Sequence, residues 1–201
     1  MIFIPEHECT AEIEMKRSRF ISTVHKVISP EEAKLRVQKV REEYSDSTHV
    51  VWAFATGEEN SQTMGMSDDG EPKGTAGKPT LALLQYGNIT NTLITTVRYF
   101  GGTKLGTGGL VKAYTDAAQS ALQNTRLKEL VEEVKVTIAF AYKFTDGVKQ
   151  ILQHYSCKIN NEQFTENVQI VFIVPVIHKE KITVDLIDET AGTVVFSEPD
   201  N

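Results

Sequence analysis

The sequence has few cysteines and lacks any long hydrophobic run. Its 201 residues include two cysteines, Cys9 and Cys157, which lie far apart and share no metal-ligand spacing with the histidines. We therefore expect free thiols in a reducing cytoplasm rather than a disulfide framework or a zinc site. No apolar run reaches about 18 residues, so no transmembrane helix and no membrane partner are expected. The first residues turn acidic without a basic stretch before an apolar one, so no secretory signal is expected either.

An excess of positive charge is also missing. The net charge is -6, and residues 1–128 hold 15 basic and 15 acidic residues, whereas residues 129–201 hold 6 and 12. This contrast predicts a boundary between one domain at 1–128 and a second at 129–201. A broad basic surface for nucleic acid is excluded, so binding of that kind needs a local patch, and nothing in the sequence points to DNA.

Glycine, by contrast, is concentrated in one stretch. Ten of the 13 glycines lie between residues 65 and 109, and eight of these ten fall in two loops at 68–78 and 101–109. Between these loops, residues 79–86 have the apolar spacing of a helix, and residues 92–99 form a β-branched run typical of a buried strand. A helix is predicted to follow the second loop over residues 110–127.

The remaining segments predict an α+β fold. Ahead of the glycines we expect an edge strand at 9–15, a strand at 20–27, a helix at 30–44, strands at 49–55 and 63–67, and a turn-rich connection at 56–61. Ser29, Pro30 and Glu32 form a strong helix start. After residue 128 the pattern predicts strands at 134–142, 158–164, 168–174 and 193–196, with helices from 145 and over 179–189. That order, βαββαβ, is the ferredoxin-like arrangement.

The second glycine loop has the topology of an anion-binding cradle. A strand, a glycine loop and a helix start expose backbone amides that attract anions. The Walker and dinucleotide patterns both fail, because Thr107 occupies the lysine position of the first and Val111 the last glycine of the second. The alternative is that the glycines only allow close packing of helix and strand. The candidate residues for anion or nucleic-acid binding are Arg98, Gly101, Gly102, Lys104, Gly106, Gly108 and Gly109.

The first glycine loop is acidic. Asp68, Asp69 and Glu71 lie within four residues and could hold Mg²⁺ or perform acid/base chemistry, although their spacing is not that of an EF-hand. The alternative is a solvated turn. Further candidates for the same cleft are His49, Thr75 and Tyr99. No catalytic residue is assigned, because no nucleophile motif is present.

A smaller basic cluster lies near Phe20. Lys16, Arg17 and Arg19 could meet phosphates, although solvated charge is the simpler interpretation.

These motifs together resemble the YigZ/IMPACT family, in its bacterial two-domain form. The resemblance is strongest over about residues 18–115. The residues that carry it are Ser18 to Phe20, His49, Ser67 to Pro72, Gly74 to Gly77, Pro79, Arg98 to Gly102, Leu105, Gly106 and Gly108 to Leu110. The resemblance implies a first domain with the ribosomal protein S5 domain 2-like fold. It also implies a ferredoxin-like second domain similar to domain V of elongation factor G. Eukaryotic members are similar to regulators of translation, whereas bacterial members have no settled activity.

Two functions follow as hypotheses. The first is a non-enzymatic, translation-linked protein that contacts RNA, the ribosome or a translation protein through both loops. The alternative is an enzyme for a phosphorylated or nucleotide substrate, with Mg²⁺ at the acidic loop as its cofactor. A pure protein-interaction module is a third reading. The loops themselves discriminate: if Asp68 or Glu71 pairs with Arg98 or Lys104, they form a structural lock, and if the charges face an open cleft they form a binding site.

Overall fold

The computed structural model describes residues 1–58 and 61–197 and divides the chain into two compact units, Met1–Leu130 and Val131–Asn201. Part of the connection expected at 56–61, residues 59–60, lies outside the described residues, as does the end of the second predicted domain, residues 198–201. Within the described chain, every helix is too short or too polar to cross a membrane.

An antiparallel sheet forms the centre of the first unit. Its strand order is β2-β3-β6-β4-β5, with β2, the predicted edge strand, at one border. The bounds are Cys9–Met15 (β2), Ser18–Lys26 (β3), His49–Thr56 (β4), Thr63–Ser67 (β5) and Thr92–Tyr99 (β6). These strands agree with the sequence prediction to within a few residues.

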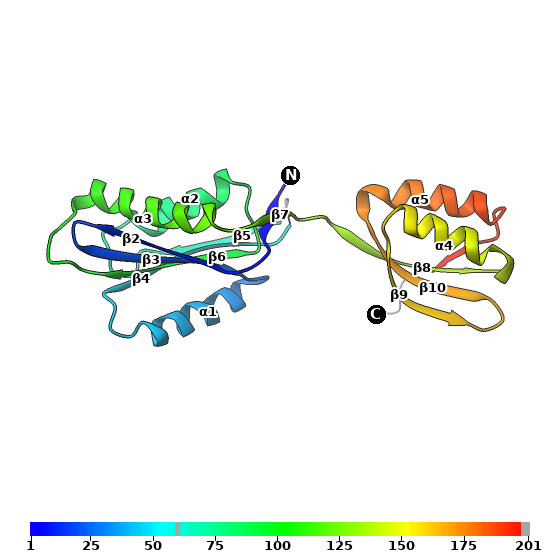
Figure 1. Cartoon of the computed structure of the whole chain (residues 1–201), viewed down its shortest axis with the longest axis horizontal. Coiled ribbons are helices and arrows are strands. Elements are labelled where there is room, and N and C mark those ends of the chain that lie inside the picture. The colour runs from blue at the N-terminus through cyan, green and yellow to red at the C-terminus, as the bar shows by residue number, and fades with distance from the viewer. Residues whose placement is uncertain (59–60, 198–201) are drawn as a thin grey trace. The chain divides into compact units, whose positions relative to one another are not determined.

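Helices cover both faces of this sheet. Helices α2 (Gly77–Tyr86) and α3 (Gly106–Gln123) lie on one face, and α1 (Pro30–Glu43) lies on the other (Figure 1). The predicted start of α1 is confirmed, because the Glu32 amide donates to Ser29 Oγ at 3.2 Å and the Ile28 amide donates to the Glu32 carboxylate at 2.7 Å.

Each face of the sheet has its own apolar core. Towards α3, Phe20 and Val51 pack with Tyr114 and Ala117. Towards α1, residues of β4 and β6 pack with alanine and valine side chains of the helix. Because side chains alternate along a strand, neighbouring residues of β4 and β6 serve opposite faces.

Two helices begin earlier than predicted. Helix α2 starts at Gly77 instead of residue 79, and α3 starts at Gly106 instead of residue 110 and ends at Gln123. Gly106, Gly108 and Gly109 therefore belong to the first turn of α3 and not to a loop. The prediction failed here because glycine is a poor helix former, and tertiary packing overrides that preference.

A small sheet that the sequence did not predict joins the start of the chain to the end of the first unit. Strand β1 (Phe3–Pro5) pairs antiparallel with β7 (Leu127–Glu129). Both strands are three residues long, and no local pattern identifies segments that short.

The second unit has the predicted βαββαβ order, and the α+β prediction is confirmed. A four-stranded antiparallel sheet of order β11-β8-β10-β9 carries α4 and α5 on one face (Figure 1). Its core includes Ile138, Leu152, Ile170 and Leu186. The bounds are Glu133–Phe140 (β8), Tyr142–Phe144 (the short 3₁₀ helix η1), Thr145–His154 (α4), Lys158–Phe164 (β9), Val168–Pro175 (β10), Val176–Glu189 (α5) and Val195–Ser197 (β11).

Candidate functional site

Both glycine loops lie at the same end of the five-stranded sheet. The acidic loop follows β5, and a second loop, residues 100–105, follows β6. Strands β3 and β4 begin at this end, because Arg98 of β6 pairs with both Phe20 and His49. The antiparallel register therefore brings together two loops that are about 30 residues apart in sequence.

A buried ion pair joins the two loops. Arg98 Nη1 donates to Glu71 Oε1 at 2.5 Å, and the two side chains are only 6% and 4% exposed. The same oxygen accepts a hydrogen bond from the Tyr114 hydroxyl at 2.8 Å, and His49 Nε2 lies 3.8 Å away. Burial, followed by the nearby Glu71 charge, raises the pKa of Tyr114, so this hydroxyl stays protonated as a donor. The charges are therefore paired, which is the geometry of a structural lock.

Asp68 holds the start of α2. Its carboxylate accepts hydrogen bonds from the backbone amides of Gly74 at 2.7 Å, Ala76 at 3.0 Å and Gly77 at 2.8 Å. Burial alone raises the pKa of Asp68, but the three amides outweigh it and hold that pKa below its usual value. A side chain eight residues upstream thus satisfies amides that a local cap usually satisfies.

Asp69 connects the acidic loop to β4 and α1. Its Oδ2 accepts from the Val50 amide at 2.7 Å, its other oxygen pairs with Arg41, and its carbonyl accepts from His49 Nδ1 at 2.7 Å. All three carboxylates of the loop are thus bonded to protein donors. Among the described residues, no group of three His, Cys, Asp or Glu side chains is arranged to hold a metal ion. The geometry therefore gives the magnesium hypothesis no support.

Arg98 does not reach the surface, which corrects its place among the anion-binding candidates. Its guanidinium lies between the rings of Phe20 and Phe100, 5.4 and 5.5 Å from their centroids, and Nη2 lies 3.5 Å from Ser18 Oγ. Its Nε has no hydrogen-bond partner in the part of the chain that the structure describes. A guanidinium 6% exposed and paired with Glu71 positions the loop, and it is not available to a phosphate.

The middle of the loop at 100–105 is exposed, although Leu105 at its end is buried. Gly102, Thr103 and Lys104 are exposed, and Phe100 is 47% exposed. The amide of Gly101 donates to Ser18 Oγ at 3.1 Å, which ties the loop to the start of β3.

Gly101 also brings a basic turn against the loop. A Cβ atom at this position would lie 2.0 Å from the backbone of Arg17, so only glycine allows so close an approach. Lys16 and Arg17, both exposed and in the left-handed region at φ 48° and 67°, form the turn between β2 and β3. The sequence identified Lys16 and Arg17 as part of a basic cluster with Arg19 but could not place them beside residue 101.

The first turn of α3 is exposed next to the same loop. Gly106, Thr107 and Gly108 are exposed, and within the described chain no side chain caps the helix start. The first amides of an uncapped helix point outward and favour negative charge.

Of the three residues predicted to share a cleft, Tyr99 lies on the other face of the sheet. His49 contacts the acidic loop, and Thr75 is buried with its hydroxyl donating to the Pro72 carbonyl at 2.7 Å. Tyr99 follows Arg98 in β6 and so faces α1, where its hydroxyl donates to Asp46 at 2.8 Å. The prediction placed Tyr99 on the wrong face because it did not follow the alternation of the strand.

Two residues of the lock were missed as functional candidates. Tyr114 lies within the predicted helix at 110–127 and was not singled out, yet a buried tyrosine generally needs a partner for its hydroxyl. Ser18 was noted only as part of a family motif, and its contacts with Gly101 and Arg98 cross 80 or more residues of sequence. No local pattern reports a contact at that separation.

Comparison with known proteins gives one consistent result. Residues 16–122 match the model of the Impact N-terminal domain. A protein of Haemophilus influenzae described as an IMPACT family member is 33% identical over 194 residues, which cover 96% of this chain and 94% of that protein. The IMPACT family member YigZ of Escherichia coli is 35% identical over 192 residues, covering 95% and 94%. A crystal structure of a hypothetical protein covers all of this chain and 98% of its own, with 33% identity and a TM-score of 0.68.

Proposed function

The chain belongs to the IMPACT family, and from that premise we propose that it is a translation-linked regulatory protein that binds RNA, alone or within the ribosome. Membership in this family supports the link to translation, because eukaryotic members are similar to regulators of translation. The near-complete match to bacterial members supports carrying the proposal to a chain with both units.

The observation that carries the proposal is a convergence of cationic groups at one end of the sheet. We define the loop surface as the turn at residues 16–17 together with residues 100–108. It holds the exposed cations Lys16, Arg17 and Lys104, none of which forms an ion pair with another described residue. The uncapped start of α3 adds outward-facing amides. This is a local patch of the kind that a protein with a net charge of -6 needs to bind phosphate.

The buried lock supports the loop surface from below. Glu71 and Arg98 fix the base of the loop, and Ser18 fixes Gly101, so the exposed atoms of residues 102–104 project from a rigid support. A loop that is ordered before binding loses less entropy when its partner arrives. The acidic loop therefore acts as a scaffold for the loop at residues 100–105.

Phe100 adds an aromatic surface to the same loop. The residue is 47% exposed, and one side of its ring covers the Arg98 guanidinium. Unpaired bases stack on exposed aromatic rings, and base stacking complements phosphate contacts in proteins that bind single-stranded RNA.

Binding of a labelled single-stranded RNA to the full chain over a salt series tests the proposal. Contacts with about three phosphates predict a slope near -2 in the logarithm of affinity against that of salt concentration, between about 50 and about 200 mM. Sedimentation with ribosomes, before and after nuclease treatment, separates RNA contacts from protein contacts. No RNA binding at about 50 mM salt, or an affinity indifferent to salt, would overturn the phosphate-contact mechanism.

A further inference from the structure

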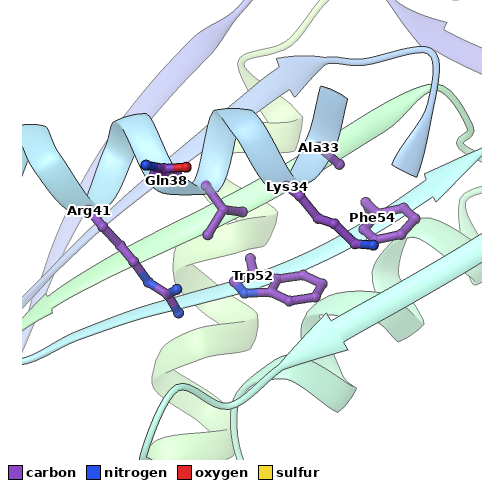
Figure 2. Close-up of a pocket in the computed structure, with 7 residues that line it drawn as sticks. Ala33, Lys34, Gln38, Arg41, Trp52 and Phe54 are labelled. Atoms are coloured by element: carbon purple, nitrogen blue, oxygen red, sulfur yellow. The ribbon is translucent and has the colours of Figure 1, made fainter. Parts of the chain in front are cut away.

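A groove lies between α1 and β4, on the face of the sheet opposite α2 and α3. Its volume is about 320 Å³. Figure 2 shows the side chains that line it. We call it the α1–β4 groove. Its lining residues are Ala33, Lys34, Val37, Gln38, Arg41, Trp52 and Phe54. A volume of this size is at the lower end of the range for small-molecule sites, and an apolar lining with a few polar groups is typical of them.

Two aromatic side chains form the floor of the groove. Trp52 and Phe54 project from the same face of β4, with ring centroids 5.9 Å apart and ring planes inclined by only 15°. The Phe54 ring lies over Gly65 of β5, where a Cβ atom would approach it to 2.6 Å. Phe54 is buried, whereas Trp52 keeps part of its indole exposed to the groove.

The rim of the groove is polar and cationic. Lys34, Gln38 and Arg41 are exposed along one side of α1, and Figure 2 shows the side chains of Lys34 and Arg41 descending from the helix on either side of Trp52. Lys34 forms no ion pair with any described residue. Arg41 pairs with Asp69 through Nη2 only, which leaves most of its N–H donors unused.

The spacing of these two cations selects the kind of ligand. Lys34 and Arg41 are seven residues apart, which places them about 10 Å apart along the axis of a helix. Figure 2 shows the two side chains on either side of Trp52, so successive phosphates of a strand can follow the rim and contact one after the other. A flat ring system suits the floor, because bases of any sequence stack on aromatic side chains.

We propose that the α1–β4 groove binds unpaired nucleotides of single-stranded RNA, with a base stacked on Trp52 and backbone phosphates contacting Lys34 and Arg41. The choice of RNA rests on the proposed function, whereas the stacking and the phosphate contacts rest on the groove. Asp69 links the two surfaces, because it binds Arg41 at the rim and belongs to the acidic loop that supports residues 100–105. A strand in the groove would therefore leave it at the end of the sheet that carries the loop surface.

The chain provides its own probe, because Trp52 is its single tryptophan. Titration of the unlabelled full chain with a single-stranded RNA decamer should quench Trp52 fluorescence to saturation. An abasic decamer, which has the phosphates but no bases, should bind more weakly and leave the fluorescence nearly unchanged. Fluorescence anisotropy of a labelled decamer measures total binding independently.

Matched variants test the two halves of the proposal. Trp52→Leu should weaken decamer binding about tenfold, the loss expected for one stacked base. Tyr86→Leu, at an aromatic residue 89% exposed on α2, should leave decamer binding unchanged.

Lys34→Gln should reduce the steepness of the salt dependence by about 0.7, the value for one phosphate contact in a single strand. Lys39→Gln, outside the groove on the same helix, should not. Thermal unfolding verifies that each variant is folded. The fluorescence titration of the wild-type protein tests base stacking without any variant.

The outcomes separate this inference from the proposed function. If the labelled decamer binds while Trp52 fluorescence stays constant and Trp52→Leu binds normally, the groove inference is wrong and the loop surface remains the binding site. Equal quenching by the abasic decamer would also overturn it, because no base would be stacked. Tighter binding of a DNA decamer would overturn the choice of RNA. Absence of binding by anisotropy would overturn both proposals.

Discussion

The guanidinium of Arg98 and the carboxylate of Glu71 form a buried ion pair that joins the end of β6 to the acidic loop, 27 residues earlier in the chain. Removing two charges from water costs several kcal/mol per ion, so a buried pair is stable only when each charge keeps its partners. Here the Tyr114 hydroxyl supplies a further donor to the Glu71 carboxylate. The pair explains why both loops carry charge although these two charged side chains are buried.

Removal of Glu71 should therefore destabilise the protein strongly. Glu71→Ala leaves the Arg98 guanidinium buried without its counter-ion, and the expected loss is about 3–5 kcal/mol in the free energy of unfolding, measured with urea. Asp116→Ala is the control, because its exposed pair with Lys112 on α3 contributes at most about 0.5 kcal/mol. A loss for Glu71→Ala no larger than that of the control would show that the ion pair is not a lock.

The hydrogen bonds of Asp68 should make the stability of the fold depend on pH in the acidic range. Its pKa is lowered in the folded protein, so its contribution is fully present above about pH 4, the range of an unfolded aspartate, and is lost as pH falls through the lower folded pKa. Asp68→Asn should be less stable than wild type at neutral pH, and the two unfolding curves should converge below about pH 4. A difference that persists unchanged to about pH 2.5 would contradict this account.

The buried hydroxyl of Tyr114 should ionise only at strongly alkaline pH, with a loss of stability of the fold. Burial, together with the Glu71 charge, raises the pKa of its hydroxyl, so the hydrogen bond to Glu71 stabilises the fold below about pH 10 and is lost only as pH rises through the folded pKa. In a spectrophotometric titration, Tyr114→Phe should remove one tyrosine from the group that ionises only when the protein unfolds. Loss of a freely titrating tyrosine instead would place the Tyr114 hydroxyl in contact with solvent.

Gly101 and Gly108 should respond oppositely to alanine. Gly101→Ala forces a Cβ atom into the Arg17 backbone, so it should destabilise the protein by several kcal/mol or displace the turn at residues 16–17. Gly108 lies in α3, and a Cβ there meets no described atom within 4 Å, so Gly108→Ala should stabilise by up to about 1 kcal/mol. Thermal unfolding of both variants checks this, and equal effects would argue against the close approach at Gly101.

The parts of the fold that the sequence predicted are those with strong local signals. Ser29, Pro30 and Glu32 mark the start of α1, and β-branched runs mark the buried strands. The failures have non-local causes. Helix α2 starts early because Asp68 satisfies its first amides from eight and nine residues away. The strands β1 and β7 exist only through their pairing with each other.

The candidate site was predictable in its residues but not in its geometry. The charges in the two glycine loops selected Glu71 and Arg98, and the family motifs include both residues. Their types alone left a lock and a binding site open. Pairing and burial are properties of the folded chain, and they moved Arg98 from the surface to the base of the loop. Trp52 shows the same limit: its strand was predicted, but its position beneath Lys34 and Arg41 depends on how α1 crosses β4.

The most direct test of RNA binding at the loop surface is the salt dependence measured for Lys104→Gln. Lys104 is exposed in the loop, and no ion pair joins it to another described residue, so the variant should fold normally. It should also bind RNA more weakly and lose about 0.7 from the steepness of the salt dependence. Lys112→Gln, at an exposed lysine of α3 already paired with Asp116, should keep the wild-type slope. Identical slopes for wild type and both variants would contradict the account, because the RNA would then bind without contacting the loop surface.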